Sequence, residues 1–132
     1  MTDAGRAEPR WLDKALALAI HDRQLAEHGG GVGVRDAAML ESALARPINR
    51  WVNGDDDPAS LAAAYAFGVA RNHPFVDGNK RTAWVLARLF LVINEYDLAF
   101  SAQEAIVAML TLAAGETSEE EIADWFRERL AD

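Results

Sequence analysis

Most of the side chains that could do chemistry lie in one short stretch, residues 72–81, which reads NHPFVDGNKR. His73 carries an imidazole, a side chain that takes up protons near neutral pH, so it can act as a base toward a hydroxyl group. Asp77 can hold a divalent cation, because Mg²⁺ is commonly bound by one or two carboxylates together with substrate phosphates. The stretch therefore pairs a candidate base with a candidate metal ligand.

The same stretch is suited to binding an anion. It leads into a predicted helix that starts near Asn79, where backbone N–H groups are free and carry a partial positive charge. Gly78 allows the backbone to curl close to a ligand. Lys80 and Arg81 add full charges in the first turn, where cations oppose the helix dipole unless an anion lies between them. A base, a metal ligand and a phosphate cradle are the parts needed to transfer a phosphorus group to a hydroxyl.

Each of these residues also has an ordinary structural interpretation. A single histidine is more often structural than catalytic, and an aspartate before a glycine, as at Asp77, commonly forms a turn. A lysine–arginine pair is commonly a solvated surface. Phe75 is flanked at a distance of two residues by the polar His73 and Asp77, and we expect it to enter the core and anchor the loop. The functional interpretation depends on the combination.

Helical periodicity and helix-start signals predict an all-α fold, a compact bundle of about six helices with no strand of useful length. The expected helices are residues 11–28, a short helix from Asp36 that stops before Pro47, a helix from Asp57-Pro58 that ends before Pro74, a helix from Asn79, and two helices that start at capping boxes, Ser101 with Glu104 and Ser118 with Glu121. The helix from Asn79 is apolar on several sides, so we expect it to be the central buried one. The expected irregular stretches are 29–35, 46–57 and 71–78.

Length and charge limit the function further. The 132 residues fit a single domain over 1–132, with 1–10 as a flexible N-terminal segment. No signal-peptide or membrane-spanning pattern is visible, so we expect a cytoplasmic protein. The net charge of −8 argues against direct nucleic-acid binding, which depends on cations that neutralise phosphates. Residues 71–88 instead carry a local charge of +3, which suits a small anionic ligand, although charge clusters are commonly solvated faces.

The segment from His73 to Arg81 resembles the signature of the Fic/Doc superfamily, H-x-F-x-[DE]-[AG]-N-[GK]-R. The likeness to the death-on-curing (Doc) toxin branch extends over most of residues 12–130. It includes the following segments: Ala19-Ile20-His21-Asp22 with the glycine-rich loop after it, Arg35-Asp36, Leu40 to Pro47, Arg81-Thr82-Ala83, and Ala114-Gly115-Glu116.

This resemblance implies a Fic fold and a role for each residue of the motif. His73 is then the catalytic base, Asp77 the Mg²⁺ ligand and Phe75 the structural anchor of the loop. The residues implied to bind the phosphates of ATP are Gly78, Asn79, Lys80, Arg81 and, near the site, Arg71.

Two departures from the AMP-transferring Fic pattern bear on the chemistry. Those proteins have glycine at the position of Lys80 and a second arginine at the position of Trp84. In the Doc branch the implied result is a flipped nucleotide that presents its γ-phosphate, and the implied target is a threonine of elongation factor Tu, with arrest of translation. AMP transfer remains an alternative, because Pro74 and Gly78 resemble ordinary Fic proteins, and so does a non-catalytic binding module of the same fold.

The resemblance also implies partners. Self-inhibited Fic proteins carry a helix of the form [ST]-x-x-x-E-[GN], and here Thr117 to Glu121 is followed by Ile122. Inhibition is therefore expected from an antitoxin, whose C-terminal tail binds as a helix near the site. A target-clamping flap is expected at Ile48, Asn49, Arg50, Trp51, Val52 and Asn53. His21 and His28 lie on or at the end of the first helix. His21 could face the site, but for both we favour a role on the helix surface.

Overall fold

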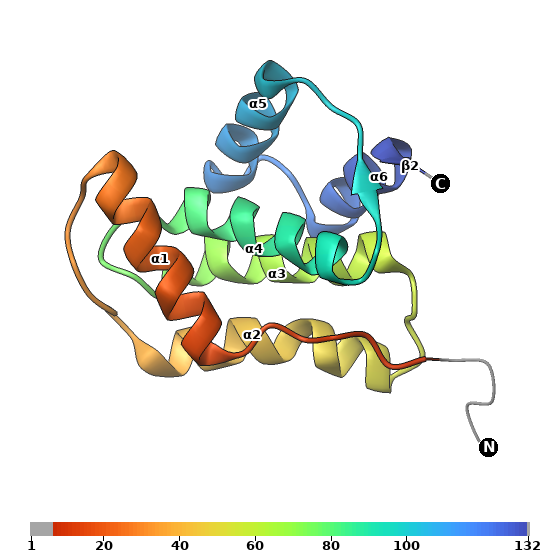
Figure 1. The fold of residues 1–132 in the computed structure, drawn as a ribbon, viewed down its shortest axis with the longest axis horizontal. Helices are drawn as coiled ribbons and strands as arrows, with labels where there is room; N and C mark the ends of the chain where they lie inside the picture. Colours follow the sequence, from red (N-terminus) through yellow and green to blue (C-terminus); the bar gives the residue numbers. More distant parts are fainter. Residues whose placement is uncertain (1–6, 132) are drawn as a thin grey trace.

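The computed structural model describes residues 7–131, and this part of the chain confirms the predicted all-α fold (Figure 1). Its six helices are α1 (Lys14–His28), α2 (Ala37–Val52), α3 (Pro58–Asn72), α4 (Asn79–Ile93), α5 (Ala102–Ala113) and α6 (Glu119–Arg129). Of the N-terminal segment predicted to be flexible, residues 1–6 lie outside the described part. Within the same predicted segment, Arg10 is bound to the end of α4, since its N–H donates to Asn94 Oδ1 (2.8 Å) and its carbonyl accepts from Asn94 Nδ2 (3.1 Å).

Most helix starts are the ones that local sequence signals predict. Asp36 and Asp57 cap α2 and α3 through their carboxylates, and Pro58 occupies the first turn of α3. Both capping boxes form, at Ser101 and Ser118. α1 starts three residues later than predicted, because the carboxylate of Asp13 accepts from Leu16 N and caps it there.

The predicted end of α2 before Pro47 is wrong. The helix continues through Pro47 to Val52, and Pro47 is buried. Proline removes one hydrogen bond and costs ~3 kcal/mol in a helix interior. The apolar face of α2 nevertheless continues past it, because Leu40, Leu44 and Pro47 are buried together. Burial of this long face outweighs the local break.

The helix from Asn79 was expected to be the central buried one, and this is wrong: α4 is buried on one face, whereas α3 is buried almost all round. α3 contacts α2, α4, α5 and α6. Its middle is a run of alanines, whose small side chains let several helices approach at once. At Gly68 the approach of α2 is so close that a Cβ would lie 3.2 Å from the Cα of Ala43. The apolar residues on the other sides of α4 are not in the core: Trp84 and Val85 are half-buried and Val92 is exposed.

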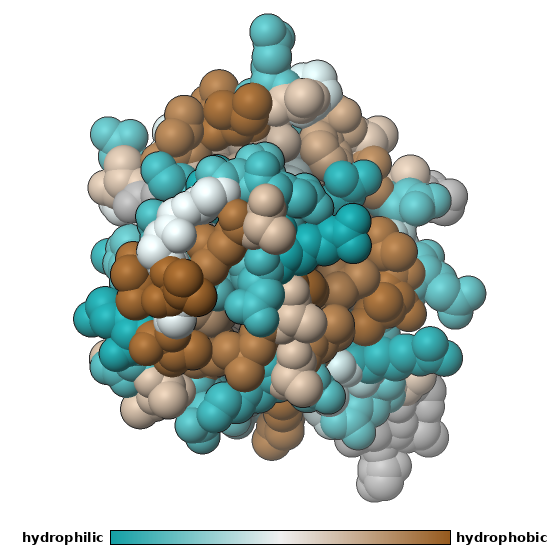
Figure 2. All heavy atoms as spheres, turned by 60° about the vertical axis from the view of Figure 1, so that its left-hand side comes forward, coloured by the Kyte–Doolittle hydropathy of each residue, from teal (hydrophilic) through white to brown (hydrophobic). Residues whose placement is uncertain are grey.

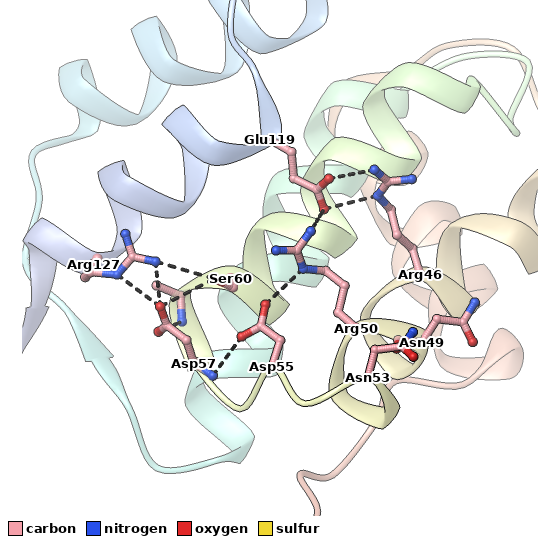
Figure 3. Close-up of polar contacts among 10 residues, drawn as sticks. Arg46, Asn49, Arg50, Asn53, Asp55, Asp57, Ser60, Glu119 and Arg127 are labelled. Carbon is pink, nitrogen blue, oxygen red and sulfur yellow. Dashed lines mark hydrogen bonds and ion pairs between the residues drawn. The ribbon is translucent and has the colours of Figure 1, made fainter.

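Ion pairs connect α6 to the far end of α2 and to the linker before α3 (Figure 3). Glu119 binds Arg46 (2.6 Å) and Arg50 (3.6 Å), both on α2. Arg127 binds Asp57 (2.5 Å), the residue that caps α3. The arginines of these pairs reach the surface, where an ion pair stabilises by at most ~1 kcal/mol, so the pairs contribute mainly to the position of α6.

A two-residue strand pair, which the sequence did not predict, joins the same region. β1 (Asp97–Leu98) pairs antiparallel with β2 (Leu130–Ala131), with Asp97 opposite Ala131. Strands this short have no visible periodicity. None of the helices within residues 7–131 is long and apolar enough to cross a membrane.

Candidate active site

The motif lies in a loop, residues 73–78, that connects α3 to α4. His73 ends α3 in the left-handed conformation (φ 47°), which is strained for a residue with a side chain. The guanidinium of Arg35 stabilises this end: its Nε donates to the carbonyl of His73 (2.8 Å) and its Nη2 to that of Asn72 (3.0 Å). The imidazole of His73 is exposed.

The segment that flanks this loop is residues 33–36. Val34 forms an antiparallel bridge with Phe75, and Val76 N donates to Gly33 O (3.1 Å). The carbonyl of Pro74 accepts from Arg35 N (2.7 Å) and from Asp36 N (3.0 Å). The outer side of the loop is therefore held by backbone hydrogen bonds.

The prediction of an irregular flap at residues 48–53 is also wrong. These residues are helical instead, because the apolar face of α2 continues through Pro47. They form the last turns and the C-cap of α2, at the end away from the motif loop (Figure 1), and they are Ile48, Asn49, Arg50, Trp51, Val52 and Asn53. Arg50 is paired with Asp55 and Glu119, and Trp51 packs edge-on against Trp11.

Phe75 anchors the inner side of the loop, as predicted. Its side chain is 1% exposed. Its backbone N–H donates to Asn79 Oδ1 and its carbonyl accepts from Asn79 Nδ2, both at 3.0 Å. The amide side chain of Asn79 is thus bound to the loop, and the group of Asn79 that remains for an anion is its backbone N–H.

His21 is not on the helix surface. It is 2% exposed, and its ring stacks on that of Phe75, with the centroids 3.8 Å apart and the planes at 7°. Its Nε2 lies 2.7 Å from the carbonyl oxygen of Asp77. The expectation was wrong because burial of this face of α1 depends on the loop that packs against it.

The carboxylate of Asp77 is exposed and held by two backbone groups. Gly78 N donates to its Oδ1 (2.8 Å) and Gly31 N to its Oδ2 (3.3 Å). These hydrogen bonds, first that from Gly78 and then that from Gly31, hold the pKa of Asp77 below its usual value. Asp77 is therefore ionised at neutral pH and keeps lone pairs for a further ligand.

α4 is the one helix within residues 7–131 that begins without a side-chain cap. Its N-cap is Gly78, in the left-handed conformation (φ 75°). The first intrahelical hydrogen bond runs from Thr82 N to Gly78 O, so the N–H groups of residues 79–81 precede it. No carboxylate of the described chain forms an ion pair with Lys80 or Arg81, so both charges are available to an anion.

A pocket of about 510 Å³ brings these groups together. Its polar wall consists of His73, Asp77, Gly78, Asn79, Lys80 and Arg81. Its apolar wall comes from Ile106, Met109 and Leu110 on α5. Figure 2, which brings the end of the molecule with α1 and the loops forward, shows hydrophobic and hydrophilic surface side by side there.

Besides the flap residues, two predicted residues do not line this pocket. Phe75 is buried beneath the loop, as its anchoring role requires. Arg71 points elsewhere: its guanidinium lies over the ring of Phe67, 5.2 Å from the centroid. The pocket therefore gathers every predicted phosphate-binding residue except Arg71.

Trp84, at the position where AMP-transferring Fic proteins have a second arginine, faces an aromatic cluster. Its ring lies 5.3 Å from Phe100, 5.4 Å from Trp125 and 5.8 Å from Phe126, measured between centroids. This cluster connects α4 to α6. Position 84 on the second turn of α4 therefore contributes to packing between helices and does not supply a cation for a phosphate.

Sequence reasoning assigned no contact to Arg35 and favoured a surface role for His21, yet both side chains hold the loop. Both fall in segments that carry the Doc-branch likeness, Ala19 to Asp22 and Arg35-Asp36. That likeness was the available signal, although it did not indicate which groups of the loop each side chain would bind.

The comparisons with known proteins agree with this geometry. A sequence model of the Fic/DOC family matches residues 11–91. "Toxin Doc" of Mycolicibacterium smegmatis (strain ATCC 700084 / mc(2)155) is 48% identical over 73 residues, which are 54% of this chain and 56% of that relative's length. "Protein kinase doc" of Escherichia phage P1 is 33% identical over 111 residues, 83% of this chain and 87% of the relative. The chain belongs to the Fic/DOC family.

Proposed function

We propose that this chain is a Doc-type toxin, a protein serine/threonine kinase that transfers the γ-phosphate of ATP to a hydroxyl of a protein target. The names of the two relatives, a Doc toxin and a protein kinase, support the class. The observation that carries the proposal is the pocket, where the exposed imidazole of His73 faces the same space as an uncapped, cationic helix start. The proposed target is a threonine of elongation factor Tu, and the proposed consequence is arrest of translation.

In this mechanism the target hydroxyl enters beside His73. The imidazole accepts the hydroxyl proton as the new bond from oxygen to the γ-phosphorus forms and the bond to ADP breaks. Lys80, Arg81 and the first N–H groups of α4 bind the phosphate oxygens, whose charge they offset. The hydrogen bonds that hold the loop keep His73 at a fixed distance from Lys80 and Arg81.

The residues present fit a Mg²⁺ ion shared with the nucleotide. Within residues 7–131 no cluster of three or more acidic or histidine side chains could hold a metal by itself. Asp77 is a single exposed carboxylate, the number that Mg²⁺ commonly takes from a protein when substrate phosphates supply other ligands. Bound there, the ion would offset negative charge on the phosphates.

Transfer of phosphate is favoured over transfer of AMP by the start of α4. Lys80 places a long cationic side chain where AMP-transferring Fic proteins have glycine, and Trp84 is packed in the aromatic cluster where they have a second arginine. The cations that line the pocket, Lys80 and Arg81, therefore both lie on the first turn of α4.

Labelled ATP tests the chemistry. The chain is incubated with elongation factor Tu, and separately with a bacterial lysate, with ATP labelled at the γ- or the α-phosphorus. We expect only the γ-label to reach protein, with a mass gain of one phosphate on a threonine. His73→Ala should lower transfer by at least ~10²-fold, since a base contributes about that much or more. His28→Ala, at the exposed end of α1, is the control and should be active.

Other outcomes identify the alternatives. Transfer of the α-label would mean an AMP-transferring enzyme. No transfer of either label, together with growth arrest that survives both His73→Ala and Lys80→Ala, would mean a binding module without catalysis.

We further propose that an antitoxin tail binds as a helix along the apolar wall of the pocket. Ile106 and Leu110 of this wall, one turn apart on α5, are 53% and 52% exposed, and Val107 beside them is 60% exposed. Hydrophobic surface is visible at the height of α5 in Figure 2. An amphipathic helix would cover these side chains and block the entrance used by the target.

A charge on this wall should weaken the antitoxin complex. We expect Ile106→Asp to raise the Kd for the antitoxin tail at least about tenfold, as for other central interface residues, when it is measured by calorimetry. Val92→Asp is the matched control, because Val92 is equally exposed (53%) but lies on α4 outside the pocket. Equal affinity of both variants would place the antitoxin elsewhere.

A further inference from the structure

The residue that connects α1 to the motif loop is His21. It is a buried polar side chain in a helix whose other buried residue is Ala17. It contacts the loop in two ways, by stacking on Phe75 and by the 2.7 Å contact with the carbonyl of Asp77. It does not line the pocket. Any effect of His21 on the reaction must therefore pass through the loop.

The direction of the hydrogen bond follows from its partner. A carbonyl oxygen can only accept, so the ring donates from Nε2 to Asp77 O, and this fixes which nitrogen carries the proton. The stacked ring of Phe75, parallel within 7°, fixes the plane in which that donor lies. The hydrogen bond and the stacking together therefore fix the orientation of the Nε2–H donor of His21.

Fixing this carbonyl fixes the start of α4. The Asp77–Gly78 peptide is planar, so the direction of Asp77 O sets the direction of Gly78 N–H on the opposite side of the same unit. That N–H donates to Asp77 Oδ1 (2.8 Å). One buried donor thus orients both the candidate metal-binding carboxylate and the first peptide of the anion site.

Because position 78 is a glycine, the Asp77–Gly78 peptide needs a contact from another segment to fix its orientation. Gly78 is left-handed (φ 75°), and a Cβ there would lie 3.8 Å from the Nε2 and Cδ2 atoms of His21. Glycine adopts many conformations at little cost, so the backbone alone does not select this one. The contact with His21 selects it.

We propose that His21 is a positioning residue for the phosphate-transfer site: it holds the Asp77–Gly78 peptide, and with it the carboxylate of Asp77, in the orientation that binds the nucleotide. The inference rests on the proposed kinase function for its catalytic consequence, although the hold on the peptide can be measured without catalysis.

Two substitutions separate the hydrogen bond from the stacking. His21→Phe keeps a buried ring against Phe75 and removes the donor. His21→Gln loses the ring and supplies an amide N–H that can reach Asp77 O. His28→Phe, on the exposed end of the same helix, is the control for a new phenylalanine on α1.

The first measurement is the backbone amide spectrum of the full chain, with Gly78 and Gly31 as reporters and without nucleotide. We expect His21→Phe to shift both amide signals and to speed hydrogen exchange at Gly78, whereas His21→Gln and His28→Phe leave both signals near their wild-type positions. Unchanged Gly78 and Gly31 signals in a folded His21→Phe variant would overturn the inference. If His21→Phe does not fold, His21→Gln decides: native signals support the hold, and displaced signals in a folded protein reject it.

The second measurement is binding of Mg·ADP and the rate of transfer from γ-labelled ATP. Loss of a residue that orients a ligand group commonly costs about 10–100-fold, so we expect kcat to fall by that factor in His21→Phe and to recover in His21→Gln. A wild-type chain that transfers no phosphate would reject the kinase function, while the amide signals would still test the hold. A kcat for His21→Phe equal to that of a catalytically active wild type would reject the positioning role alone.

Discussion

At the scale of single residues, the position of the Asp77 carboxylate depends on its neighbours. It is aimed by two backbone N–H groups, from Gly78 and from Gly31. The glycine-rich segment after α1 therefore does more than connect two helices. It leaves open the space that the carboxylate occupies, because a Cβ at Gly30 would lie 2.9 Å from Asp77 Oδ2.

Gly30→Ala should therefore lower transfer by displacing that carboxylate. Its φ of 127° disfavours a side chain, and the added methyl group has no room beside Asp77. We expect a rate loss of about 10–100-fold, as for other changes that misdirect a ligand group. Gly29→Ala is the matched control, since its φ is also positive (77°) but no atom lies within 4 Å of its Cβ. Equal transfer rates in the two variants would contradict the argument.

At the scale of the elements, α3 is the helix on which the others are assembled. Its alanines and Gly68 let α2 approach until a methyl group at 68 would lie 3.2 Å from the Cα and Cβ of Ala43 and 3.4 Å from its carbonyl oxygen. Two of these atoms belong to the backbone of α2, so the whole helix would have to shift. The close contact also holds the N-terminal end of α2, where Met39 O accepts from Asn72 Nδ2 beside the motif loop.

Gly68→Ala is expected to destabilise the fold, although alanine is the better helix former by about 1 kcal/mol. Overpacking in a tight core costs about 1–3 kcal/mol, which exceeds that gain. We expect a net loss on the order of 1 kcal/mol in the free energy of unfolding, measured by chemical denaturation. Combining it with Ala43→Gly removes one of the clashing groups, so the double variant should be more stable than the sum of the single effects predicts. Strict additivity would show that the two positions do not compete for space.

At the scale of the whole molecule, Tyr65 connects the middle of α3 to the chain just before α1. It is fully buried, and its hydroxyl oxygen accepts from Leu12 N (2.9 Å). Burial raises the pKa of Tyr65 to about 12, and the hydrogen bond from Leu12 acts in the opposite direction. The contact joins segments 53 residues apart, so it reports on the assembled fold.

The raised pKa predicts a loss of stability in alkali. Below pH 10 both the folded and the unfolded chain keep the phenol proton, so this residue adds no pH dependence there. Between about pH 10 and pH 12 the unfolded chain releases the proton and the folded chain retains it, so the free energy of unfolding falls, by on the order of 2 kcal/mol in total.

Tyr65→Phe is the control for this effect. It should lack the added alkaline loss, and at neutral pH it should be less stable by about 1–3 kcal/mol, because the buried N–H of Leu12 loses its acceptor. Thermal unfolding across the pH range measures both effects. A wild-type curve parallel to that of Tyr65→Phe above pH 10 would show that Tyr65 ionises without penalty.

The sequence by itself determined the features that depend on neighbours along the chain. Caps at Asp36, Asp57, Ser101 and Ser118 set where four helices start, because a side chain two or three residues away satisfies the first N–H groups. The glycine before Asn79 and the two cations after it likewise indicated the start of α4 as a candidate anion site. The burial of Phe75 could also be predicted, from an aromatic side chain in a stretch that otherwise carries polar residues such as His73 and Asp77.

Only the tertiary structure decided what depends on segments far apart in the chain. α2 continues through Pro47 because burial against α3 outweighs a missing hydrogen bond, and no local signal reports the strength of that burial. Residues 33–36 flank the motif loop, and His21 enters the interior, because the loop lies against both of them. Long-range packing selects among conformations that the local sequence leaves nearly equal in free energy, and in this molecule it selected the supports of the site.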